Sequence, residues 1–147
     1  MVIFELGIVN NGVPIISKQY YKEHNMAVSP ILRAGFLSAL NSFAEEAFAD
    51  SVESFTMKNF KIVILSRLLR KFPPLDVIAY TIGDKKLKLK VAKSALTRIL
   101  DEFIKQYGYL EDLSVNLTIF NDFLQVFDDI LGDLAKKPDD RLKSIFG

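Results

Sequence analysis

The chain has 147 residues, half of them hydrophobic and a quarter charged, which is the profile of one folded globular domain. It contains no cysteine, which excludes disulfides, thiolate metal sites and cysteine nucleophiles and is compatible with the cytosol. The formal net charge of +1 excludes a global attraction to nucleic acid. We therefore expect a cytoplasmic protein, either free or peripheral on a membrane surface, with no nucleic-acid partner.

The first third of the chain predicts a β-hairpin followed by a long helix. Residues 2–9 and 13–21 are strand-like and flank the hairpin turn signal Asn10-Asn11-Gly12. Pro14 cannot donate a ladder hydrogen bond, so the second strand is expected at the outside of the sheet. Ser29-Pro30 is a typical helix start, and apolar residues then recur at helical spacing to about residue 50. The members of this stripe are Leu32, Phe36, Leu40, Phe43 and Ala47, widened by Leu37, Ala44 and Phe48.

The rest of the chain predicts three strands and two helices. The strands are expected at 52–57, 60–65 and 75–82, with a basic loop over 66–74. Apolar residues at helical spacing predict helices over 87–107 and 118–131, and Gly108 is placed as a C-terminal stop for the first of them. Phenylalanines 120, 123 and 127 form one stripe of the second helix, which is typical of core packing.

These elements predict an α+β fold in the order β-β-α-β-β-β-α-α. Short connections make consecutive strands antiparallel, and strands that are apolar on both faces need cover on both sides. We therefore expect a five-stranded antiparallel sheet with the first helix on one face and the last two on the other. One domain is expected over residues 1–134, with a C-terminal tail over 135–147.

Charge is unevenly distributed along the chain. Residues 58–98 carry eleven Lys and Arg against two Asp, a local net charge of +9, and residues 99–134 carry eight acids against one Lys, a local net charge of −7. Such polarity either steers a charged partner or an anionic membrane surface, or reflects the solvated faces of neighbouring elements. The candidate basic patch for membrane or partner contact comprises Arg67, Arg70, Lys71, Lys85, Lys86 and Lys88.

No pattern in the sequence points to catalysis or to a bound cofactor. The single histidine, His24, has no metal-binding partner spacing, and the acids around Asp122 and Asp129 indicate a solvated helix face better than a metal site. No nucleophile elbow and no glycine-rich phosphate loop occurs. We expect no catalytic residues, no metal, no cofactor and no enzymatic activity.

Several segments together are similar to the longin (profilin-like) superfamily, and especially to the small sigma and zeta subunits of adaptor and coatomer complexes. Residues 55–63 (FTMKNFKIV) resemble the family's F-R-N-F-K-I-I strand turn, and residues 99–103 (ILDEF) resemble its V-L-N-E-Y/F helix. Residues 110–113 (LEDL) and 123–131 (FLQVFDDIL) resemble its E-L-D-L and Y-x-V-x-x-V-V-D-E-M runs.

The resemblance implies a non-catalytic protein-interaction module of vesicle-trafficking, coat or small-GTPase-associated machinery. Its partners would be a small GTPase, a coat or adaptor protein or a SNARE-like protein, and the chain would work as a homo- or heterodimer. Sigma subunits hold sorting peptides near the end of the second long helix, and the matching positions here are Gln106, Tyr107 and Leu113.

The resemblance also places the second and third strands outermost in the sheet. An exposed strand edge can pair with another chain. The segment with Val52, Phe55 and Met57 is the candidate edge.

Two other functions fit parts of the sequence. A roadblock-type regulator of a small GTPase would usually begin with a helix, whereas this chain begins with a predicted strand. A profilin-like small-molecule sensor or enzyme would need an enclosed polar pocket, which no motif in the sequence indicates.

Overall fold

The computed structural model describes residues 2–20, 29–71, 74–110, 113 and 117–132. The expected tail over 135–147 and His24 lie outside the described residues. The elements are β1 (Ile3–Asn10), β2 (Val13–Gln19), α1 (Pro30–Phe48), β3 (Ser54–Thr56), β4 (Lys61–Arg70), β5 (Leu75–Gly83), α2 (Leu89–Tyr107), the 3₁₀ helix η1 (Leu117–Phe123) and α3 (Leu124–Leu131).

The five strands form one antiparallel sheet in the order β2-β1-β5-β4-β3. This confirms the predicted class and the outer positions of the second and third strands. The hairpin of β1 and β2 closes through Asn11 and Gly12, which both have positive φ (48° and 76°), as a tight primed turn requires. The hairpin predicted from the Asn-Gly signal is therefore confirmed.

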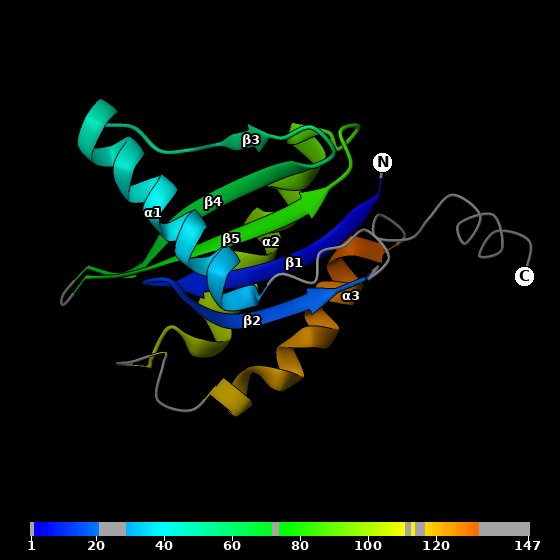
Figure 1. The fold of residues 1–147 in the computed structure, drawn as a ribbon. Coiled ribbons are helices and arrows are strands. Elements are labelled where there is room, and N and C mark those ends of the chain that lie inside the picture. The colour runs from blue at the N-terminus through cyan, green and yellow to red at the C-terminus, as the bar shows by residue number, and fades with distance from the viewer. Residues whose placement is uncertain (1, 21–28, 72–73, 111–112, 114–116, 133–147) are drawn as a thin grey trace, which may run out of the picture.

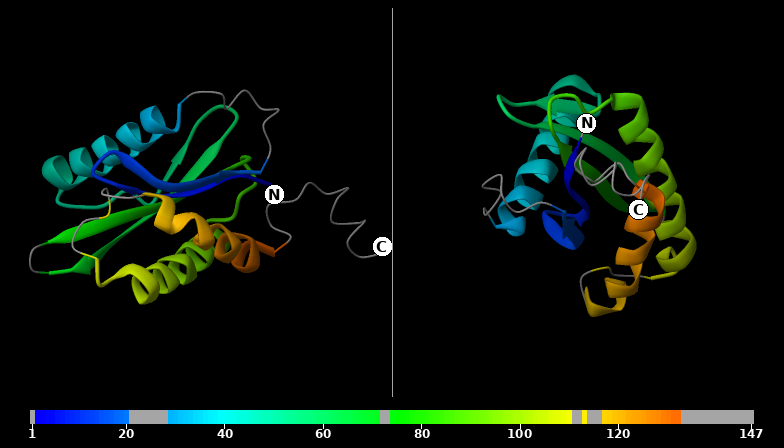
Figure 2. Two further views of the ribbon diagram at one scale, coloured as in Figure 1. Left: turned by 90° about the horizontal axis from the view of Figure 1, so that it is seen from below. Right: turned by 90° about the vertical axis from the view of Figure 1, so that its right-hand side faces the viewer.

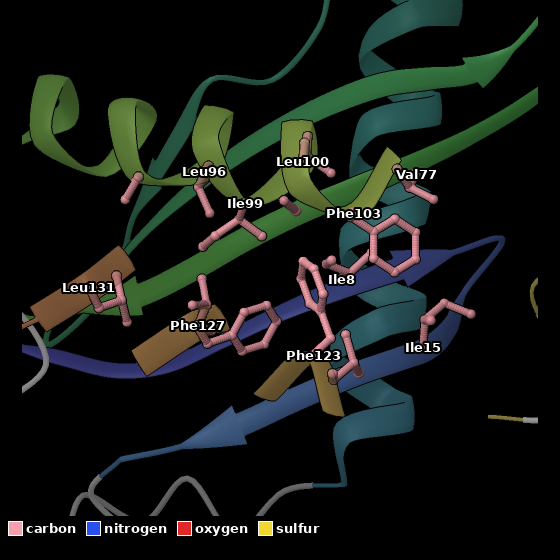
Figure 3. Packing of buried hydrophobic residues seen from close by; sticks show 14 of the residues in the cluster. Ile8, Ile15, Val77, Leu96, Ile99, Leu100, Phe103, Phe123, Phe127 and Leu131 are labelled. Carbon is pink, nitrogen blue, oxygen red and sulfur yellow. The ribbon is translucent and has the colours of Figure 1, made fainter. Parts of the chain in front are cut away.

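Helices cover both faces of the sheet. Figures 1 and 2 show α1 alone across one face, and α2, η1 and α3 together across the other. The core under α2 and α3 is the larger and is rich in phenylalanine (Figure 3). The core under α1 is smaller and comprises Val2, Phe4, Val9, Ala34, Leu37, Ile62, Ile64, Ile78, Tyr80 and Ile82.

Two expectations about local structure were wrong. The segment expected as a basic loop from Ser66 is mostly strand, because β4 continues to Arg70 and pairs with β5 through Arg67–Val77 and Leu68–Asp76. Charged side chains there do not prevent strand formation, since the ladder needs only backbone groups.

The second error concerns the helix expected over 118–131, which begins instead as the 3₁₀ helix η1 and is α-helical only in its second half. Asn121 and Asp122 are weak α-helix formers. Phe120 and Phe123 are both fully buried, and the three-residue period of a 3₁₀ helix places them on the same side.

A buried carboxylate connects α1 to the sheet. Glu5 of β1 is fully buried and accepts hydrogen bonds from Arg33 Nε of α1 at 2.8 Å and from the Tyr80 hydroxyl of β5 at 2.8 Å. Arg33 Nη2 and Gln19 Nε2 donate to the other carboxylate oxygen at 2.5 Å and 3.2 Å. A buried charge is tolerated when it is paired and fully hydrogen-bonded, and Glu5 meets both conditions.

The ring of Tyr80 reaches Glu5 by lying over Gly7. A β-carbon at position 7 would come within 2.7 Å of three atoms of the Tyr80 side chain, so no other residue fits without displacing the ring. The absence of a side chain at Gly7 is therefore part of the arrangement that satisfies Glu5.

Replacement of Arg33 by methionine keeps the apolar stem of the side chain and leaves Glu5 buried without its cation. We expect the free energy of unfolding to fall by ~3–5 kcal/mol, because an uncompensated buried charge is costly. Urea denaturation followed by circular dichroism measures the change. Arg98→Met on the exposed side of α2 is the control and should change stability little. A loss at Arg33 no larger than at Arg98 would contradict the role of the pair.

Candidate functional site

The side of α1 that faces away from the sheet is apolar. Leu32 and Phe43 are 65% and 62% exposed, and Ile31 and Phe36 are exposed as well. Phe48, the last residue of the helix, is 73% exposed. The side that faces the sheet buries only Ala34, Leu37 and Asn41. A helix that is apolar on all sides is normally covered on all sides, and no described part of this chain covers the outer side of α1.

Strand β3 extends this apolar surface. The rings of Phe36 on α1 and Phe55 on β3 meet edge to face, with 5.8 Å between their centroids. Phe43 and Phe48 make a similar contact at 6.3 Å near the end of the helix. We call the combined surface the outer α1 surface; it comprises Ile31, Leu32, Phe36, Phe43, Phe48, Phe55 and Met57.

Most of the apolar stripe from which α1 was predicted therefore faces away from the sheet and does not contribute to the core. Its members Leu32, Phe36 and Phe43 face outward, and Leu37 is the member that is fully buried against the sheet. The 3.6-residue period identified the helix correctly, but both sides of α1 carry apolar residues. The ion pair between Glu5 and Arg33 sets which side of α1 faces the sheet. A pairing between two such distant residues does not appear in the periodicity of the sequence.

Charges are absent from most of the outer α1 surface. The exposed residues from Pro30 to Phe43 are all uncharged, and Arg33 in the same segment turns inward to Glu5. The exposed acids Glu45 and Glu46 lie near the end of the helix, whose last turn has no basic residue.

The predicted edge residues lie where an edge strand was expected. Phe55 is the central residue of β3, and its side chain belongs to the outer α1 surface. Among the described strands, β3 pairs with β4 alone. Val52 and Met57 flank the strand, and the backbone N–H of Met57 donates to the Phe60 carbonyl at 2.8 Å. Only three residues of this segment form ladder pairs, so the free edge of β3 is short.

The three positions predicted to bind a sorting peptide are not alike in the structure. Gln106 is exposed on the last turn of α2. Tyr107 and Leu113 are buried in the larger core, where the Tyr107 ring packs against Phe103 and Phe120. The Tyr107 hydroxyl donates to the Ile119 carbonyl at 3.3 Å. Peptide binding at these positions stays a prediction.

The predicted basic residues fall into two groups rather than one. Arg67, Arg70 and Lys71 lie where β4 passes into β5, and Arg67 forms an ion pair with Asp101 of α2. Lys85, Lys86 and Lys88 follow the other end of β5 and are all exposed. Because β5 has nine residues and Arg67 pairs with Val77, about 20 to 30 Å of strand separates the groups.

The second group is larger than the sequence indicated. Lys61 pairs with Gly83 across the sheet, so the turn with Lys58 lies beside the turn after β5. The N-terminus of α2 adds Lys90 in its first turn, where there is no acid. We call this group the basic end; it comprises Lys58, Lys61, Lys85, Lys86, Lys88 and Lys90.

The acids of α3 include one with a structural role. Asp128 accepts hydrogen bonds from Lys18 at 2.6 Å and from the Tyr20 hydroxyl at 3.0 Å, which connects the end of β2 to α3. No group of three or more side chains that could hold a metal ion occurs among the described residues. That the acids of this helix serve no metal remains a prediction.

The surface has open grooves. One of about 430 Å³ lies between α2 and α3, with an apolar floor that includes Ala95 and Ile130 and with Lys90 and Arg98 at its sides. Another, of about 280 Å³, lies next to β4 and is lined by residues that include Glu53 and Lys93, which are paired with each other at 2.5 Å. In the described ranges, no helix is long and apolar enough to cross a bilayer.

Comparisons with known proteins assign no family to this chain. No protein-family model matches it, and no curated protein is found that resembles it in sequence. The case for a function therefore depends on the outer α1 surface and the basic end.

Two tyrosine hydroxyls make stability depend on alkaline pH. Burial raises the pKa of Tyr20 and of Tyr80 well above the ordinary value of 10.0, and the carboxylates of Asp128 and Glu5 beside the two hydroxyls raise it further. The folded chain keeps these protons where the unfolded chain releases them. The contribution of these two protonated hydroxyls to the stability of the fold is therefore complete below pH 10. It is lost progressively as the pH rises above that value.

We expect the free energy of unfolding to fall steeply above about pH 10, since the folded chain resists ionisation of these tyrosines. Tyrosinate absorbance during a pH titration should show Tyr20 and Tyr80 ionising only together with unfolding. The double variant Tyr20→Phe/Tyr80→Phe should show a shallower fall. An equal slope in both proteins would contradict the assignment.

Proposed function

We propose that this chain is a non-catalytic protein-interaction module of longin type, which acts in vesicle-trafficking, coat or small-GTPase-associated machinery. The observation that carries the proposal is the outer α1 surface. Exposed apolar patches of several hundred Å² are uncommon on monomers and mark interaction sites. The longin assignment is supported by the order of the elements, with η1 and α3 counted as one helical segment, and by the outer positions of β2 and β3.

The small-molecule alternative has less support. A small-molecule sensor or enzyme would need a closed polar pocket, and the grooves described above are open to solvent. The buried polar cluster around Glu5 is satisfied by the chain's own groups, so it offers nothing to a substrate.

Affinity capture tests the proposal. The wild-type chain, immobilised and exposed to native lysate of the source cells, should recover a small GTPase, a coat or adaptor subunit or a SNARE-like protein, identified by mass spectrometry. The variant Leu32→Glu/Phe43→Glu should lose most of that recovery, because two charges would be buried at the contact. The control Leu68→Glu/Tyr109→Glu places the same charges at exposed apolar positions elsewhere and should not. Recovery of none of these classes would contradict the proposal.

The basic end provides a second contact within the same function. Four lysines from Lys85 to Lys90 crowd the N-terminus of α2, where the helix dipole is also positive. The lysine charges repel one another and the positive end of the helix dipole. An anionic surface close to this end would reduce that repulsion. We infer that the module makes peripheral contact with acidic membranes through the basic end.

Charge reversal tests this contact. The variant Lys85→Glu/Lys86→Glu/Lys88→Glu should lose binding to vesicles with about 30% phosphatidylserine, since each lysine near an acidic membrane contributes ~1 kcal/mol. The control Lys71→Glu/Arg98→Glu/Lys105→Glu has the same net charge, with exposed sites elsewhere. Co-sedimentation at rising salt measures both. Equal loss in the two variants would show only a net-charge effect and would remove the basic end from the proposal.

A further inference from the structure

We propose that the outer α1 surface binds the same surface of a second copy of this chain, with the two α1 helices antiparallel and crossing at Ala39. The inference deepens the proposed function and rests on it: the outer α1 surface binds the second copy, and the other partners bind the homodimer, so a variant that cannot dimerise also loses those partners. The homodimer would then be the unit that meets other partners and the membrane.

The size of the surface fits a stable dimer. Its seven large side chains expose on the order of 700 Å² together, if each has roughly 150–200 Å² when fully accessible. A standard protein interface buries ~800 Å² on each partner. The apolar surface of one copy is therefore of the size that a second copy needs.

The charges on α1 favour an antiparallel partner helix. Glu45 and Glu46 lie at the negative end of their own helix dipole, with no basic residue in the last turn to compensate. In an antiparallel pair, these acids would lie beside the positive N-terminal end of the other α1. A parallel pair would place the four acids together. The remainder of the exposed surface of α1 is uncharged up to Phe43, so two copies can meet without repulsion.

The shapes of the residues on α1 select the crossing point. Ala39 is exposed and small, so two helix backbones can approach closely there. Gly35, one turn earlier, is also exposed and has nothing within 4 Å of the position where a β-carbon would be. When two antiparallel helices cross at Ala39, position 43 of one faces position 35 of the other. Phe43 of each copy then lies over Gly35 of the second copy, so a large side chain meets an open space twice.

The rest of the helix is compatible with this register. Ala47 and Ile31 of the second copy lie at the same height on opposite flanks of the contact, about 80° away from the facing direction, so neither obstructs it. Glu46 faces Leu32 in the first turn of the second helix, next to the positive end of that helix dipole. Neither pairing brings two like charges together.

Within the described residues, no contact requires glycine at position 35. Glycine in a helix interior is a weaker helix former than alanine, and nothing among the described atoms would collide with a β-carbon there. A close approach by Phe43 of a second copy would explain the glycine, because a side chain at position 35 would occupy the space that the ring needs.

Disulfide trapping tests the crossing point, and the absence of native cysteine makes the result specific. Ala39→Cys should form a covalent dimer under mild oxidation, because the two thiols would face each other on the two-fold axis. Ser42→Cys is the control on the same exposed surface. Its two copies would be offset by about 9 Å along the helices, beyond the ~7 Å that a disulfide can span between α-carbons. Trapping of Ser42→Cys as fast as Ala39→Cys would overturn the proposed geometry.

Sedimentation equilibrium of the purified wild-type chain should show a dimer. Phe43→Glu and Gly35→Leu should each weaken dimerisation ~30-fold or more, as expected for a central contact. Gly35→Leu distinguishes this from misfolding, because leucine is a better helix former and should leave the monomer at least as stable to heat. Tyr109→Glu, at an exposed site elsewhere, should remain dimeric.

A wild-type chain that stays monomeric at ~100 µM, or dimers that survive in both α1 variants, would overturn the inference. A monomer that still captures trafficking proteins would leave the proposed function standing. A dimer that captures none of them would overturn the proposed function alone.

Discussion

The buried ion pair between Glu5 and Arg33 determines how α1 lies on the sheet. An apolar inner face alone would hold this helix poorly, because only Ala34 and Leu37 supply fully buried apolar contacts from it. The carboxylate of Glu5 is fully enclosed and needs the guanidinium, so α1 has to present Arg33 to β1. That requirement sets the rotation of the helix about its own axis, and with it the side that remains outside.

The outer α1 surface follows from that rotation. With Arg33 turned toward Glu5, the stripe through Leu32, Phe36 and Phe43 points away from the sheet. A polar contact thus attaches α1 to the sheet, and the larger apolar residues of the helix face outward. This is the reverse of the usual division on a surface helix. The opposite face of the sheet shows the usual arrangement, since α2 and the segment of η1 and α3 bury their phenylalanines in the larger core (Figure 3).

Much of the fold could be predicted from the sequence, because turn and period signals act locally. The Asn-Gly turn, the Ser-Pro helix start and the succession of strands along the chain all came from such signals. The length of β4 was missed, since its last residues are held by pairing with β5 across the hairpin and carry charges typical of loops. The 3₁₀ start of the third helical segment depends on how Phe120 and Phe123 pack, which no local pattern reveals.

The candidate site was predicted less well. Phe55 and the lysines after β5 were named as exposed candidates, but Lys58 and Lys61 join those lysines only through the register of β4 and β5. The outer residues of α1 were read as an ordinary helical stripe, because the two residues that decide its orientation lie 28 positions apart and meet only in three dimensions.

The contact between Gly7 and the ring of Tyr80 has a consequence for how this sequence can change over time. Any side chain at position 7 would push the ring off β1 and take its hydroxyl away from Glu5. Positions 5, 7, 33 and 80 are therefore free to vary only as a set. In homologous chains that retain the glycine and the tyrosine, the acid and the arginine should be inherited with them, and chains that have lost one should have replaced the whole group with apolar residues.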